Sequence, residues 1–178
     1  MYFIALVAPK KINDDVLKWK QFMKERYDCS VALRSPAHIT LIPPFRTGDD
    51  AEEKLETAIL DFSLRCIPFE IKLKNFGAFR PTVIHVEVLV NETLNELHSQ
   101  LEEFLISKNL VTLTKDDRPY HPHVTIATRD LHKKAFHKAW EIFKARKYEA
   151  SWITGGISLL RHNQKNWDVI FTSRFKMV

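Results

Sequence analysis

Apolar residues recur along this chain with two periods, one typical of strands and one typical of helices. Alternating or continuous apolar runs predict seven strands, at Tyr2 to Val7, Ala37 to Ile42, Phe69 to Phe76, Val83 to Val90, His123 to Thr128, Ala150 to Leu160 and Trp167 to Phe175. Apolar residues at three- and four-residue spacing predict four helices, at Asp14 to Tyr27, from the capping residues Asp49 and Asp50 to about Cys66, at Glu92 to Ser107 and at Leu131 to Arg146.

The order of these elements is the same in the two halves of the chain. Residues 1–80 and residues 81–178 each read strand, helix, short strand, helix, strand, which is the pattern of an internal duplication. Each half has too few elements to close a core alone, so we expect an α+β fold whose two lobes share one hydrophobic interior. The interpretation is a single domain over residues 1–178, built from two pseudo-symmetric halves.

Composition narrows the class of protein. The chain has 178 residues, of which 45% are hydrophobic, and a formal net charge of +5, which weakly favours anionic partners such as phosphates. Its two cysteines, Cys29 and Cys66, form neither a disulfide framework nor a CxxC pair. The apolar run from Met1 to Ala8 is too short for a signal or membrane segment, so we expect a cytoplasmic monomer with no membrane partner.

A short motif occurs once in each half, at matching places in the repeat. The first copy is His38-Ile39-Thr40-Leu41 and the second is His123-Val124-Thr125-Ile126, each reading His, apolar, Thr, apolar. Side chains at i and i+2 of a strand share a face, so each half should present one imidazole beside one hydroxyl while the apolar residues enter the core.

Paired histidines facing one cleft suit reactions that need a base and an acid at opposite ends of a transferred group. In-line displacement at phosphorus has this requirement, and threonine hydroxyls can donate to the non-bridging phosphate oxygens. A lone strand histidine is more often structural, but its repetition reverses that expectation. The residues therefore predict a phosphoester site made of His38, Thr40, His123 and Thr125.

Two HxTx motifs in a duplicated chain of this size resemble the 2H phosphoesterase superfamily, and within it the 2'-5' RNA ligase-like, or LigT-like, group. The flanking words Ser35 to Phe45 and Tyr120 to Ala127, and Phe76 to Phe79, are also similar to that group. The resemblance implies antiparallel sheets that face a central cleft, with helices on the outer faces. It also implies metal-independent and cofactor-free hydrolysis of 2',3'-cyclic phosphate ends of RNA or nucleotides to 2'-phosphates, with His123 as base and His38 as acid, and a 2'-5' RNA ligase-like activity in addition.

Residues near the motifs are candidates for substrate contacts. His85 and Glu87 share a strand face and would line the cleft if that strand neighbours a motif strand, although a solvated face is as good an interpretation. His121 precedes the second motif, with a smaller chance of a helping role. Two aromatic residues, Phe45 and Tyr120, could stack on a base, and core packing is the alternative for them. Four arginines could bind phosphate, and a solvated charge is the alternative for each: Arg46, Arg80, Arg118 and Arg161.

Three other functions compete with this interpretation. A metal-dependent phosphoesterase needs clustered His and carboxylate ligands, and the spacing shows none beyond His121 and His123. A histidine-triad hydrolase needs a third alternating His, where this chain has Thr125. The remaining rival is a noncatalytic RNA- or nucleotide-binding module that keeps the cleft, and activity on a cyclic phosphate would separate it from the enzyme.

Overall fold

The computed structural model describes residues 1–48, 51–112 and 119–176, so the predicted capping by Asp49 and Asp50 lies outside the described residues. The strands are β1 Tyr2–Val7, β2 His38–Phe45, β3 Phe69–Phe79, β4 Val83–Val88, β5 His123–Ala127, β6 Glu149–Thr154, β7 Gly156–His162 and β8 Trp167–Arg174. The helices are α1 Lys10–Tyr27, α2 Ala51–Ser63, α3 Glu92–Ser107 and α4 Lys133–Phe143, with a short 3-10 turn at Val31–Arg34.

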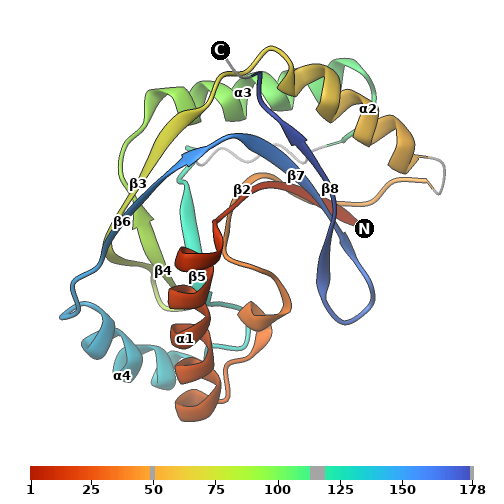
Figure 1. Ribbon diagram of the computed structural model, residues 1–178. Coiled ribbons are helices and arrows are strands. Elements are labelled where there is room, and N and C mark those ends of the chain that lie inside the picture. Colours follow the sequence, from red (N-terminus) through yellow and green to blue (C-terminus); the bar gives the residue numbers. More distant parts are fainter. Residues whose placement is uncertain (49–50, 113–118, 177–178) are drawn as a thin grey trace.

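The strands form two curled antiparallel sheets (Figure 1). The first sheet has the order β2-β1-β7-β8, and the second has the order β5-β4-β3-β6. The predicted α+β fold with antiparallel sheets is confirmed, and each motif strand occupies an edge of its sheet. Each sheet takes strands from both halves of the chain, because β3 joins the second sheet while β7 and β8 join the first.

The ends of several predicted strands shift by two to three residues, and one predicted strand is divided in the structure. The apolar run Ala150 to Leu160 is two strands, since β6 pairs with β3 in the second sheet and β7 pairs with β1 in the first. The break falls at Gly155, where the chain passes between the sheets. At the adjacent Gly156 a Cβ atom would lie 2.5 Å from the Ser173 carbonyl oxygen, so only glycine allows β7 to approach β8 so closely there.

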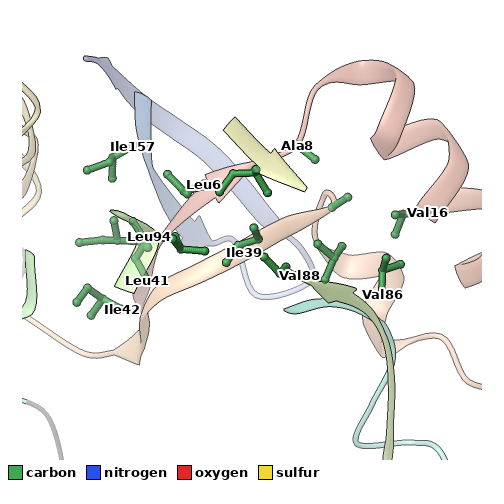
Figure 2. Packing of buried hydrophobic residues seen from close by; sticks show 14 of the residues in the cluster. Leu6, Ala8, Val16, Ile39, Leu41, Ile42, Val86, Val88, Leu94 and Ile157 are labelled. Atoms are coloured by element: carbon green, nitrogen blue, oxygen red, sulfur yellow. The ribbon is translucent and has the colours of Figure 1, made fainter. Parts of the chain in front are cut away.

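The helices tie the two sheets into one core. Helices α2 and α3 pack on strands of the first sheet, whereas α1 and α4 pack on strands of the second. Leu6, Ile39 and Leu41 of the first sheet belong to the same buried cluster as Val86 and Val88 of the second (Figure 2). Among the described residues, no helix is both long enough and apolar enough to cross a membrane.

Candidate active site

Both motifs occupy strands that alternate between core and opposite face, as their spacing predicted. The His and Thr of each motif are partly buried, whereas the intervening apolar side chains are fully enclosed in the core. These enclosed residues are Ile39, Leu41, Val124 and Ile126. Burial of the apolar pair fixes the register of each strand, because a slip of one residue would bring the polar pair into the core. Each strand therefore holds an imidazole and a hydroxyl side by side.

The two catalytic candidates are held in the same way. His38 Nδ1 lies 2.8 Å from the carbonyl oxygen of Pro36, and His123 Nδ1 lies 2.7 Å from that of His121. A carbonyl oxygen only accepts, so in both rings Nδ1 carries the proton and donates it. The neutral form of each ring then has its lone pair on Nε2. Both Nε2 atoms are thereby prepared to accept or donate a proton to a substrate.

The fold brings the two motifs close together although 85 positions separate their histidines in the chain. Strands β2 and β5 contact one another across the two sheets. The Tyr120 hydroxyl, just before β5, donates to the Thr40 carbonyl oxygen in β2 over 2.9 Å. In addition, the charge of His123 is near enough to lower the pKa of His38. The chemistry of one motif is therefore electrostatically linked to that of the other.

The surroundings of His38 favour its neutral form. The pKa of His38 is lowered to about 4, chiefly by burial and in smaller part by the positive charge of Lys20, against the hydrogen bond to the Pro36 carbonyl, which raises it. Lys20 is 3% exposed, and its ammonium donates to the Ser35 carbonyl oxygen over 3.0 Å. The ring of Phe3 lies 4.8 Å from the His38 ring, centroid to centroid. An imidazolium at this position would lose hydration and gain a cationic neighbour.

The surroundings of His123 are polar. Strand β4 pairs with β5 so that Glu87 lies opposite His123 and His85 lies opposite Thr125, and cross-strand partners share a face. The His85 ring is 5.0 Å from the His123 ring, and Phe79 contacts both rings. Burial is the largest cause that lowers the pKa of His123, and the charge of His121 also lowers it. The hydrogen bond to the His121 carbonyl and the Glu87 carboxylate oppose that shift without reversing it. His85 and Glu87 thus stand beside the second motif.

Glu87 lies between two imidazoles. Its Oε1 atom is 3.2 Å from His85 Nε2, and its Oε2 atom is 3.4 Å from His121 Nε2. Ligand atoms from these three residues lie within 4.8 Å of one another, so they could hold a metal ion. Spacing along the sequence did not reveal this cluster, because the pairing of β4 with β5 assembles it.

Two of the predicted substrate ligands point elsewhere. Phe45 is 6% exposed and packs in the core near Tyr2, so its ring cannot stack on a base. Arg161 donates two hydrogen bonds to Glu52 of α2, at 3.1 and 2.9 Å. Because Arg161 is the cross-strand partner of Tyr2, it shares the helix-covered face of the sheet and points away from Phe3 and His38. Phe45 therefore packs in the core, and Arg161 pairs with a carboxylate of α2.

The remaining candidates differ in how open they are. Arg80 is exposed and lies over the Trp140 ring, 5.8 Å from its centroid, whereas Arg46 is exposed directly after β2. Tyr120 is partly buried, and His98 stacks on its ring with 3.7 Å between centroids. Arg118 lies outside the described residues.

Three neighbours of the histidines were not singled out from the sequence. Lys20 had a signal that could have found it, because a charged residue lies within the apolar stripe of the first helix, beside Val16 and Met23. Phe3 and Phe79 look like ordinary apolar strand residues, and only the folded sheets place them against the imidazoles.

Comparison with known proteins gives the family. The sequence profile of the 2'-5' RNA ligase superfamily matches residues 8–166. A candidate phosphoesterase of Geobacillus kaustophilus is 33% identical over 132 residues, which cover 73% of this chain and 69% of that protein. An RNA 2',3'-cyclic phosphodiesterase of Methanocaldococcus jannaschii is 30% identical over 128 residues, covering 70% and 68% of the two chains.

A solved structure shares the fold. LigT of Escherichia coli, crystallised with 3'-AMP, superposes with a TM-score of 0.68 at 16% identity, over 99% of this chain and 98% of that chain. At this identity the likeness concerns the arrangement of helices and strands. The profile match covers most of the sequence, and the chain therefore belongs to the 2'-5' RNA ligase superfamily and is a phosphoesterase, as its two HxTx motifs indicated.

Proposed function

We propose that this phosphoesterase hydrolyses 2',3'-cyclic phosphate ends of RNA or nucleotides to 2'-phosphates, without a metal ion, through His38 and His123. The observation that carries the proposal is the matched orientation of the two rings, each with Nδ1 donating to a backbone carbonyl two residues earlier. This arrangement leaves two Nε2 atoms of equal geometry for one proton acceptor and one proton donor, which a displacement at phosphorus requires.

The proposed reaction is a single displacement. One Nε2 removes a proton from water as the water oxygen bonds to phosphorus, and the other Nε2 gives a proton to O3' as the bond from phosphorus to O3' breaks. Thr40 and Thr125 stand beside the two rings on the same strand faces, so their hydroxyls would donate to the non-bridging oxygens. Such donors stabilise charge where it is held in the transition state.

We assign the base to His38 and the acid to His123, the reverse of what the family resemblance implies. Burial and Lys20 both favour the neutral form of His38, and a base must be neutral in order to accept a proton. The pKa of His123 is also lowered, chiefly by burial, but the Glu87 carboxylate opposes that shift, so we place the proton of the acid on His123.

The substrate we propose is an RNA terminus or a short nucleotide. The net charge of +5 is modest, and Arg80 and Arg161 are engaged with Trp140 and Glu52. A long RNA tract would need many phosphate contacts. Two names fit this class of substrate: the Methanocaldococcus jannaschii relative is an RNA 2',3'-cyclic phosphodiesterase, and LigT has been crystallised with 3'-AMP and with ATP.

The test is hydrolysis of a short RNA that ends in a 2',3'-cyclic phosphate, with and without EDTA, with the product identified by mass spectrometry and by resistance to a 3'-phosphatase. We expect a 2'-phosphate product at the same rate in both buffers. The double variant His38→Ala, His123→Ala should be inactive. The matched control is the double variant His132→Ala, His137→Ala. It removes two exposed histidines, one just before α4 and one within it, and should keep full activity.

Two outcomes would contradict the proposal. Turnover by the double variant would remove the histidines from the chemistry, and loss of turnover in EDTA would make a metal ion part of it. Binding of the cyclic end with no turnover by the intact protein would instead support a noncatalytic nucleotide-binding module.

A further inference from the structure

The cluster of His85, Glu87 and His121 has no counterpart in the other half of the molecule. The β1 to β2 pairing places Ala5 opposite Thr40 and Val7 opposite His38, just as the β4 to β5 pairing places His85 and Glu87 opposite Thr125 and His123. Pro36, two residues before His38, corresponds to His121. The first motif thus has Ala, Val and Pro where the second has three potential metal ligands.

The fold therefore does not need these polar residues. His85 is 1% exposed, and its Nδ1 atom is buried without a hydrogen-bond partner in the described part of the chain. Burying an unsatisfied polar atom destabilises a protein, and the first half shows that an apolar residue can occupy this place. A buried imidazole at a position where alanine suffices indicates a binding role.

The backbone leaves space for this pair. Gly77 of β3 is the cross-strand partner of His85. A Cβ atom at Gly77 would overlap the Glu87 carboxylate and would lie 2.5 Å from His85 Nε2, so glycine is required for the two side chains to adopt their positions. Glycine here makes room for polar side chains, because the residue lies within a strand and needs no unusual backbone angle.

The distances fit a transition metal ion. Bonds of 2.0 to 2.2 Å from a tetrahedral Zn²⁺ to N and O ligands place neighbouring ligand atoms about 3.4 Å apart. The observed separations are 3.2 Å between His85 Nε2 and Glu87 Oε1 and 3.4 Å between His121 Nε2 and Glu87 Oε2, so the carboxylate must turn to present one oxygen to both imidazoles. Two imidazoles and one carboxylate suit Zn²⁺ and its neighbours in the Irving–Williams order, whereas Mg²⁺ and Ca²⁺ prefer oxygen ligands.

The longest separation within the cluster, up to 4.8 Å, can close without disturbing the core. His121 is 54% exposed and Glu87 is 34% exposed, so both can move toward the buried His85, which serves as the fixed ligand. Three protein ligands leave at least one coordination position open.

We propose that His85, Glu87 and His121 form a binding site for a single Zn²⁺-class divalent ion beside the second motif. The site shares Glu87 with the surroundings of His123, but the hydrolysis proposed above needs no metal, so either proposal can fail alone. The ion would bind through His85 Nε2, one Glu87 oxygen and His121 Nε2. His123 keeps its own hydrogen bond to the His121 carbonyl and is not a ligand.

The experiment is titration of the purified full chain, freed of metal, with Zn²⁺ by calorimetry and with Co²⁺ by visible absorption. We expect one equivalent to bind and a d–d spectrum of four- or five-coordinate Co²⁺. His121→Ala and Glu87→Gln should each weaken binding by at least the roughly 10- to 100-fold that loss of a supporting partner costs at known sites. The buried ligand is tested with His85→Ala. Alanine is chosen because Ala5 occupies the corresponding position in the first half, so the fold should accommodate it.

Two controls separate this site from other histidines. His132→Ala, His137→Ala removes exposed imidazoles, and His123→Ala removes the catalytic candidate; both should keep the affinity within a few-fold. Circular dichroism and thermal unfolding without metal check that each variant is folded. The proposal is overturned if the wild-type chain shows no one-to-one binding, or if folded Glu87→Gln and His121→Ala bind as the wild type does.

Discussion

The two motif strands have the same sequence pattern but different neighbours. His38 is surrounded by Phe3, a buried Lys20 and the apolar strand β1, whereas His123 is beside the polar residues of β4. Both rings nonetheless donate from Nδ1 to a carbonyl two residues earlier. The two motifs therefore share the orientation of their imidazoles and differ in the charges around them.

This difference shows how a symmetric fold can carry out an asymmetric reaction. A displacement at phosphorus needs one neutral and one protonated imidazole, which two identical sites would not provide reliably. Burial lowers the pKa of both rings, but the neighbouring charges act with opposite signs, because Lys20 lowers the pKa of His38 and Glu87 opposes the lowering at His123. Under the proposed function, the neighbours of the motifs, and not the motifs themselves, would set the roles of the two histidines.

The largest effect should come from removing either ring. Under the proposed function, His38→Ala and His123→Ala each lower kcat by at least the roughly 10²-fold typical of an acid or a base, despite their different surroundings. Single-turnover assays on a cyclic-phosphate RNA would measure this. Loss of activity in only one of the two variants would break the idea that the halves contribute one catalytic imidazole each.

The next effect concerns the hydroxyls. Valine keeps the β-branched shape that a strand favours, so Thr40→Val and Thr125→Val should fold normally. Loss of a donor to the phosphate should lower kcat by about 10²- to 10³-fold, as removal of oxyanion donors does, while serine at either position should retain most activity. If valine proved harmless at one position, the two threonines would differ in role as their neighbours do.

A smaller effect is expected in the pH profile. Lys20, whose pKa is lowered by burial to about 8, is charged under acidic and neutral conditions and opposes protonation of His38. Lys20→Met should therefore raise the pKa of His38, and the acidic limb of kcat/KM should move to higher pH. The other group whose charge lowers the pKa of His38 is His123, and it is still present in this variant.

The exposed Lys18 of the same helix provides the matched control, because Lys18→Met should leave the limb in place. A shift of the alkaline limb in Lys20→Met would make His38 the acid and reverse the assigned roles. No shift of either limb would show that Lys20 does not act on His38.

Local signals explain what the sequence could predict. The alternation around His38 and His123 established their faces, because burial of Ile39 and Val124 depends only on period two within a few residues. Helix α3 was located to the residue, because the apolar residues at helical spacing that predicted it, Leu94, Leu97, Leu101 and Leu105, form its buried face.

Long-range pairing explains what could not be predicted. The division of Ala150 to Leu160 between two sheets depends on which partner strand each part meets. Arg161 meets Glu52 from 109 positions away, and the cluster around Glu87 depends on the register of β4 against β5. Residue type alone gave Phe45 and Arg161 plausible substrate roles, whereas the fold packs Phe45 in the core and pairs Arg161 with Glu52.

The smallest effect should distinguish two roles of Tyr120, which lies between the motifs. Tyr120→Phe keeps the ring that stacks on His98 and removes only the hydroxyl that donates to the Thr40 carbonyl. If Tyr120 holds β2 in place, loss of this hydrogen bond should lower the free energy of unfolding by about 1 kcal/mol and kcat/KM by a few-fold. If its ring stacks on a substrate base, activity should not change. Tyr148→Phe is the control. It removes a hydroxyl that lies 3.4 Å from Asp15 and bonds to neither motif strand, so it should leave kcat/KM unaltered. Equal kcat/KM in Tyr120→Phe and the wild type would show that the bridge between the two motifs contributes nothing to their alignment.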